Sequence, residues 1–151
     1  MTPRQMWELY PDHIGKYDAW SFGTDADRLA ELVRTGTKTA TSSAFILYKS
    51  ENVPIPQTGD HSIILDALGA AVCIIRTTAV TVIPFSEVTA EHAYKEGEGD
   101  RSLDHWRKVH RLFFEKELRK IDMCFSEDMT VVCEEFEVVF RDDCTKKSNT
   151  T

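Results

Sequence analysis

Two segments of the chain place apolar residues three to four positions apart, which is the spacing of a helix with one buried face. In the first, residues 24–36, Thr24 and Asp27 resemble a helix start and Gly36 marks the end. In the second, Ser102 is a residue type that caps helices, and the apolar side chains that follow it fall on one side. These side chains are Leu103, Trp106, Val109, His110 and Phe113. The pattern predicts a short helix before Gly36 and a longer helix after Ser102.

Four other stretches are rich in β-branched residues and predict strands. They cover residues 37–48, 62–66, 70–83 and 130–140. An Ala-Leu-Gly turn separates the second stretch from the third, which favours an antiparallel hairpin in a strongly curved sheet. Residues 85–95, between the third and fourth stretches, suit short helical turns.

These elements predict one α+β domain, and their simplest packing is a small curved mixed β-barrel flanked by helices. We expect the domain to cover residues 24–140. Residues 1–23 contain five aromatic side chains, which predicts an arm that packs onto the core. The polar residues 141–151 predict a solvated tail.

The charge balance limits the possible partners. The chain has 18 Lys plus Arg and 25 Asp plus Glu, a net charge of −7, so the molecule as a whole repels polyanions. We therefore do not expect a protein that coats duplex nucleic acid. A local basic patch, or a ligand no larger than a nucleotide, remains compatible with this charge because phosphate contacts need only a few cations.

The cysteines and the apolar runs bear on the compartment. The four cysteines are widely spaced and form no zinc motif; they are Cys73, Cys124, Cys133 and Cys144. Cys73 and Cys133 lie in apolar stretches and are predicted to be buried thiols, as in reducing compartments. The chain shows no signal peptide and no run of the roughly 18 apolar residues that a membrane span needs. We expect a cytoplasmic protein without a membrane partner.

The segment 36–41, GTKTAT, is the first candidate for chemistry. A desolvated lysine can act as a base or hold an oxyanion, and a neighbouring threonine hydroxyl can become a nucleophile. In an extended strand Thr39 and Thr41 share one face and Lys38 lies on the other, so Lys38 and Thr41 converge only if the chain turns or bulges. The alternative is that the hydroxyl residues express strand propensity and that Lys38 is solvated. The spacing of a P-loop is absent.

The segment 96–100, EGEGD, is the second candidate. Its glycines let the backbone approach a ligand, and its acids Glu96, Glu98 and Asp100 can handle protons or a divalent ion beside Arg101. The alternative is an acidic surface turn before a helix.

The third candidate is the pair Trp106 and His110, which is spaced for neighbouring positions on one helix face. Trp106 could stack on a base and His110 could transfer a proton. Core packing is the alternative, because both residues lie on the apolar side of the helix.

Taken together, several segments resemble an ASCH-domain protein. They are GTKTATSS, PIPQTGD, VTVIPFSEV, EGEGDRSLDHWRKVHRLFF and VVCEEFEVVF. The resemblance covers roughly residues 20–140 and implies a β-barrel of the kind found in PUA domains. Members of the family have been assigned to RNA recognition, to divalent-ion-assisted RNA cleavage and to hydrolysis of the acetyl amide of N(4)-acetylcytidine.

In the amidohydrolase branch of that family, a lysine, a threonine and a glutamate carry the reaction, and by resemblance these are Lys38, Thr41 and Glu96. That branch is shorter, and its motif continues with an arginine where this chain has Ser42 and Ser43. The resemblance therefore implies catalytic roles that the departures put in question.

The resulting hypothesis is a hydrolase that acts on RNA or on a modified ribonucleoside. In its amidase form Lys38 takes the proton from Thr41, Thr41 attacks the amide carbonyl, and Glu96 protonates the leaving amine. In its ribonuclease form Lys38 and Arg101 bind phosphate, the acids handle protons, and a divalent cation such as Mg or Mn is a possible cofactor. The residues expected to bind substrate are Thr39, Ser42, Glu98, Asp100, Arg101, Trp106 and His110. The alternative is a non-catalytic RNA or nucleotide reader, and both a monomer and a homodimer remain open.

Overall fold

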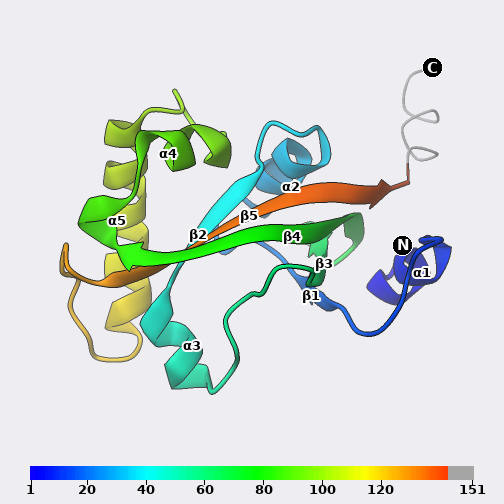
Figure 1. Cartoon of the computed structure of the whole chain (residues 1–151), viewed down its shortest axis with the longest axis horizontal. Helices are drawn as coiled ribbons and strands as arrows, with labels where there is room; N and C mark the ends of the chain where they lie inside the picture. Colours follow the sequence, from blue (N-terminus) through cyan, green and yellow to red (C-terminus); the bar gives the residue numbers. More distant parts are fainter. Residues whose placement is uncertain (143–151) are drawn as a thin grey trace.

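The computed structural model describes residues 1–142 as a five-stranded sheet with five α-helices (Figure 1). The α-helices are α1 (Pro3–Leu9), α2 (Ala26–Arg34), α3 (Phe45–Glu51), α4 (Ala90–Glu96) and α5 (Leu103–Arg119). The strands are β1 (Asp18–Trp20), β2 (Ala40–Ala44), β3 (His61–Leu65), β4 (Ala71–Pro84) and β5 (Thr130–Arg141), and a 3-10 turn, η1, covers Phe85–Glu87. The predicted α+β class with a curved mixed sheet is confirmed.

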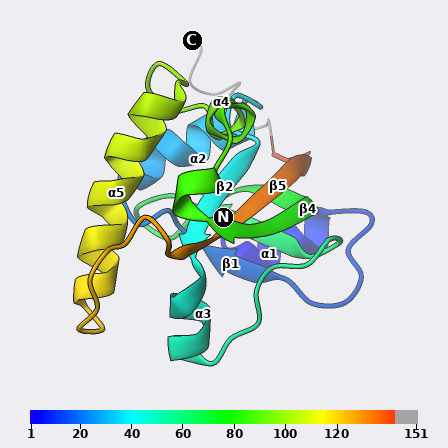
Figure 2. The ribbon, with the colours of Figure 1, turned by 60° about the vertical axis from the view of Figure 1, so that its left-hand side comes forward.

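The sheet has the strand order β1-β3-β4-β5-β2. β1 pairs with β3 in parallel, and the remaining pairs are antiparallel. The long strands β4 and β5 change register twice, between Ile74 and Ile75 and between Thr77 and Ala79. Such irregularities bend and twist the strands, and the sheet curls into a half-barrel around its inner face (Figure 2).

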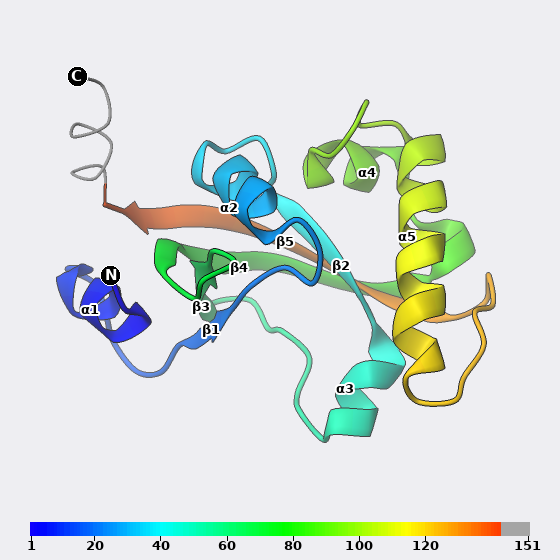
Figure 3. The ribbon, with the colours of Figure 1, turned by 180° about the vertical axis from the view of Figure 1, so that it is seen from behind.

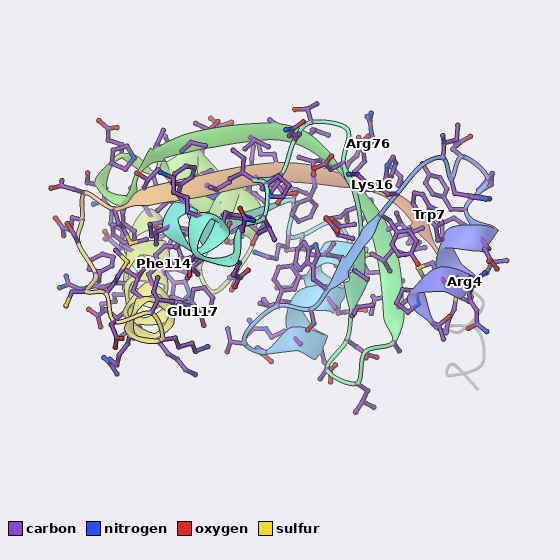
Figure 4. All side chains as sticks on the ribbon, turned by 90° about the horizontal axis from the view of Figure 1, so that it is seen from below. Arg4, Trp7, Lys16, Arg76, Phe114 and Glu117 are labelled. Atoms are coloured by element: carbon purple, nitrogen blue, oxygen red, sulfur yellow. The ribbon has the colours of Figure 1, made fainter. Side chains whose placement is uncertain are left out.

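The hydrophobic core has one cluster at each end of the long strands β4 and β5. At one end α4, α5 and η1 cover β2 and the start of β5, around Phe85, Trp106 and Phe114. At the other end α1 packs Trp7 against β3 and β4. Helices α1 and α5 lie at opposite ends of the molecule (Figure 3), as do the side chains of Trp7 and Phe114 (Figure 4). A third cluster packs α2 against β3, β4 and β5.

Several boundaries differ from the sequence prediction. The predicted strand 37–48 ends at Ala44, and Phe45–Glu51 forms α3. A short apolar run does not distinguish a strand from a helix, and here the side chains of the run pack against β2 and β5. Asp25, with a left-handed backbone and no side-chain cap, precedes α2, so Thr24 is not its N-cap.

Two other expectations, the cap of α5 and the burial of two thiols, are met. Ser102 caps α5 and accepts a hydrogen bond from the amide of His105. Cys73 and Cys133 are buried, and Cys144 lies outside the described residues. The predicted tail 141–151 also lies outside them, except for residues 141 and 142. No helix within residues 1–142 combines the length and the apolar character that crossing a membrane requires.

Candidate functional site

A buried charged cluster forms where β2 meets α4 and α5. Alternation along β2 turns Ala40, Ser42 and Ala44 toward these helices, and Lys38, two residues before Ala40, points the same way. The Lys38 side chain is only 1% exposed, so the alternative of a solvated lysine is wrong. The cluster is completed by Ser42, His92, Glu96, Glu98, Trp106 and His110.

Lys38 holds two acidic residues. Its Nζ lies 2.8 Å from Oε2 of Glu98, 3.2 Å from Oε1 of Glu96 and 3.3 Å from the Glu96 carbonyl oxygen. Glu96 is the last residue of α4 and is 2% exposed, so the predicted flexible loop begins one residue later, at Gly97. The ion pair joins the segment that precedes β2 to the end of α4.

Both oxygens of the Glu96 carboxylate accept hydrogen bonds. Ser42 Oγ donates to Oε2 at 2.5 Å, and the indole Nε1 of Trp106 donates to the same oxygen. His92 Nε2 lies 3.0 Å from Oε2, and His110 Nε2 lies 3.3 Å from Oε1. Burial would raise the pKa of Glu96, but the charges of Lys38 and His110 and the imidazole hydrogen bonds hold it well below its usual range. Glu96 is therefore ionised at neutral pH.

His92 is a member of the cluster that the sequence analysis missed. Burial lowers its pKa, but hydrogen bonds to Cys133 and Glu96 and the Glu96 charge raise it from 6.5 to about 9. The sequence feature that could have identified His92 is its spacing from Glu96, four residues later on the same helix.

Trp106 and His110 belong to the core as well as to the cluster. Their rings stack with centroids 4.3 Å apart and an interplanar angle of 14°. Nδ1 of His110 donates to the Trp106 carbonyl oxygen at 3.0 Å, which fixes the imidazole with Nε2 toward Glu96. Because Trp106 is buried and already stacked, its ring face is closed to a base.

The cluster does not form a serine triad. Ser42 Oγ lies 2.7 Å from His92 Nε2, as a nucleophile would. However, Glu96 approaches that same nitrogen, whereas a triad acid binds the other one.

Within residues 1–142 no group of three or more His, Cys, Asp or Glu side chains is placed to hold a metal ion.

Thr41 lies away from the cluster. It faces the opposite side of β2 from Ser42, because neighbouring strand residues point to opposite faces. Within residues 1–142 it makes no side-chain hydrogen bond to Lys38 or Glu96, so the turn or bulge that would bring Lys38 and Thr41 together is absent. The proposed grouping of Lys38, Thr41 and Glu96 is therefore not assembled in this structure.

On the face of Thr41 lies a buried acid that the sequence analysis also missed. Glu134 pairs with Thr41 in the β2–β5 register and accepts a 2.7 Å hydrogen bond from Oγ1 of Thr77. Burial raises the pKa of Glu134, although the Thr77 hydrogen bond opposes this shift. Alternation with Val132 and Phe136 was the signal that this glutamate points inward.

The remaining candidates lie at the edge of the cluster. Thr39 donates its backbone N–H to the Lys95 carbonyl at 2.7 Å. Asp100 accepts from the backbone N–H of Ser102 at 2.9 Å. Arg101 lies against the ring of Tyr94. These side chains are more exposed than the buried cluster and do not contact Glu96.

A pocket of ≈ 340 Å³ lies between the C-terminal end of α2 and the second half of β5. It is lined by Val33, Arg34, Thr35, Gly36, Lys38, Thr39, Phe136, Val138, Val139, Phe140 and Arg141. Nη1 of Arg141 donates to the Arg34 carbonyl oxygen at 2.8 Å, which joins the two sides. Lys38 and Thr39 are the sequence-predicted site residues in its wall. A second cavity, of ≈ 10 Å³, is bounded by Glu96, Glu98, His105 and His110, among others.

Comparison with known proteins identifies relatives over nearly the whole chain. The sequence model of the ASCH domain matches residues 18–140. The crystal structure of an ASCH domain from Lactobacillus crispatus is 31% identical, with a TM-score of 0.85 over 91% of this chain and 94% of that one. A protein from Enterococcus faecalis is 35% identical, with a TM-score of 0.85 over 96% of this chain and 91% of that one. No curated protein matches this sequence.

Proposed function

The chain belongs to the ASCH domain family, and on that premise we propose that it binds one nucleotide of single-stranded RNA, or a free ribonucleoside. The observation that carries this proposal is the ≈ 340 Å³ pocket between α2 and β5. Its wall includes Lys38 and Thr39 from the segment on which the family resemblance rests.

The size and lining of the pocket suit a nucleotide. Small-molecule sites typically span about 300–1,000 Å³ and combine apolar walls with a few polar groups. Phe136 and Val138, which pack in the cluster beside α2, supply apolar surface for a base. The guanidinium of Arg141 supplies the donors for phosphate in this proposal, because that of Arg34 already binds Glu31 through two hydrogen bonds. The net charge of −7 opposes tight binding along a long polyanion, which favours a site for a single nucleotide.

The buried cluster supports binding over amide hydrolysis. A lysine base must release a proton, but Lys38 is paired with two carboxylates that need its charge. A glutamate acid must carry a proton, but the pKa of Glu96 lies well below its usual range. Thr41 is turned to the other face of β2. In this proposal the cluster fixes the shape of the pocket wall through Lys38.

A second candidate function is hydrolysis of RNA or of a modified ribonucleoside, and the ≈ 10 Å³ cavity favours it. A cavity of this size accommodates about one water molecule, and Glu96 and His110 in its wall can orient that water. Substrate reaches this cavity only if the loop after α4 moves, because Glu96 is 2% exposed.

Equilibrium binding tests the first proposal. We expect uridine monophosphate and a short single-stranded RNA to bind the wild-type protein, and Arg141→Ala to weaken both about tenfold through the loss of a charge-assisted contact. Arg76→Ala, an exposed arginine on the neighbouring strand β4, is the matched control and should bind as wild type. Thermal unfolding of both variants confirms that each is folded. The proposal fails if neither ligand binds, or if the two variants behave alike.

A turnover assay tests the second candidate with the same protein. Acetylated cytidine and single-stranded RNA are incubated with and without Mg or Mn, and product is followed by chromatography. Turnover that Glu96→Gln abolishes would support hydrolysis, and the absence of any product would eliminate it.

A further inference from the structure

We propose that Tyr94 and Arg101 form a stacking platform for the base of a second nucleotide, beside the pocket that holds the first. This inference rests on the proposed binding function and narrows the ligand to a single strand of at least two nucleotides. A free nucleoside would leave the platform empty.

The platform presents an aromatic ring to solvent. Tyr94, near the end of α4, is 57% exposed, and within residues 1–142 no other Phe, Trp or Tyr side chain is as exposed. Cζ of Arg101 lies 3.7 Å from the centroid of the Tyr94 ring, which is a close cation–π contact. Nucleobases stack on aromatic rings and on guanidinium planes alike, so this pair offers the surface that a base prefers.

The pair is held in place by the loop between α4 and α5. Nε of Arg101 donates to the Tyr94 carbonyl oxygen at 3.0 Å, and Nη2 lies 3.5 Å from the Thr37 carbonyl oxygen. Arg101 itself has a positive φ of 65°, a conformation that is costly for a side-chain-bearing residue. Gly97 packs so closely that a Cβ there would lie 2.4 Å from the oxygen of Thr37. The loop thus directs the guanidinium back over the ring.

The charge of Arg101 is available to a ligand. Both of its acceptors are neutral backbone carbonyls, and within the described part of the chain no carboxylate forms an ion pair with it. Asp100, the neighbouring acid, is turned to the backbone N–H of Ser102. An arginine in this state can stack on a base and attract the adjoining phosphate.

The platform adjoins the pocket through one residue. Thr37, whose carbonyl receives Arg101, lies between Gly36 and Lys38, and both of these line the pocket. The next residue, Thr39, bonds to the carbonyl of Lys95, which follows Tyr94 in α4. Figure 1 shows α4 beside the segment that joins α2 to β2. A strand whose first nucleotide enters the pocket can therefore place the neighbouring base on the platform.

The test compares uridine monophosphate with the dinucleotide UpU in equilibrium binding. For the wild-type protein we expect UpU to bind about tenfold more tightly, in line with the stacking of one base on an aromatic ring. Tyr94→Ala should remove this difference and leave binding of the monophosphate unchanged. Tyr94→Phe, which keeps the ring, should bind both ligands as the wild type does.

Two results would overturn the inference, and they are distinct. Equal affinity of the wild-type protein for the two ligands, or a UpU advantage that Tyr94→Ala retains, eliminates the platform and leaves the pocket proposal standing. Absence of binding by both ligands eliminates the pocket proposal and the platform with it.

Discussion

The buried ion pair gives a sharp prediction about stability, tested by Lys38→Met. Methionine fills much of the volume of the lysine stem but carries no charge. The substitution leaves Glu96, which is 2% exposed, with a buried charge whose nearest ammonium is gone. Glu98, with a side chain that is 23% exposed, loses the same partner but can reach water. The cost therefore falls mainly on Glu96.

The magnitude follows from the burial of both partners. Removing one member of a buried ion pair typically costs about 3–5 kcal/mol, because the remaining charge stays out of water. For a domain of this size each kcal/mol lowers the Tm by about 2–4 °C, so we expect a decrease of roughly 10 °C. The hydrogen bonds that Ser42 and Trp106 donate to Glu96 remain and keep the loss toward the lower end of the range.

Urea unfolding, followed by tryptophan fluorescence, measures the change. Lys95→Met is the matched control. Lys95 also pairs with two glutamates, Glu91 and Glu135, but it lies at the surface of α4, the helix that carries Glu96. Solvent screens such pairs, so the control should lose far less stability than Lys38→Met. Adding Glu96→Gln to Lys38→Met should recover part of the loss, because the uncompensated charge is removed.

The reasoning is refuted if Lys38→Met and Lys95→Met reduce the free energy of unfolding equally. It is also refuted if the double variant is less stable than Lys38→Met alone, since the Glu96 charge would then not be the source of the cost.

Two further predictions concern the same region. The pKa of His92 is raised from 6.5 to about 9. The stabilisation that protonated His92 gives the folded state is therefore fully present below pH 6.5 and is lost as the pH rises toward 9. In urea unfolding, the free energy of unfolding of His92→Gln should decrease less between pH 6.5 and pH 9 than that of the wild type. His13→Gln, a control at an exposed histidine, should show the same decrease as the wild type. Gly97→Ala should lower the Tm more than Gly59→Ala: both glycines have positive φ, but only at Gly97 does a Cβ meet a backbone atom, the oxygen of Thr37. Equal decreases in Tm would show that the close approach of the loop to Thr37 does not matter.

Local periodicity predicted much of the architecture and part of the site. The helix after Ser102 and the hairpin of β3 and β4 follow from spacing and turn residues alone. Strand alternation also indicated that Lys38 and Thr41 lie on opposite faces, and the structure bears this out. The short elements α1, α3 and β1 were missed, because runs of three to seven residues carry too little periodicity to identify them.

Long-range pairing decided the rest. Alternation along a strand assigns its side chains to two faces. Only the β2–β5 register and the packing of α4 and α5 determine which face of β2 is buried against the charged cluster. For that reason the sequence by itself marked Lys38 and Glu96 as candidates, whereas the tertiary structure brought them together with His92 and left Thr41 outside. The pocket likewise joins Arg34 to Arg141, residues that are far apart in sequence and meet only because the sheet curls around α2.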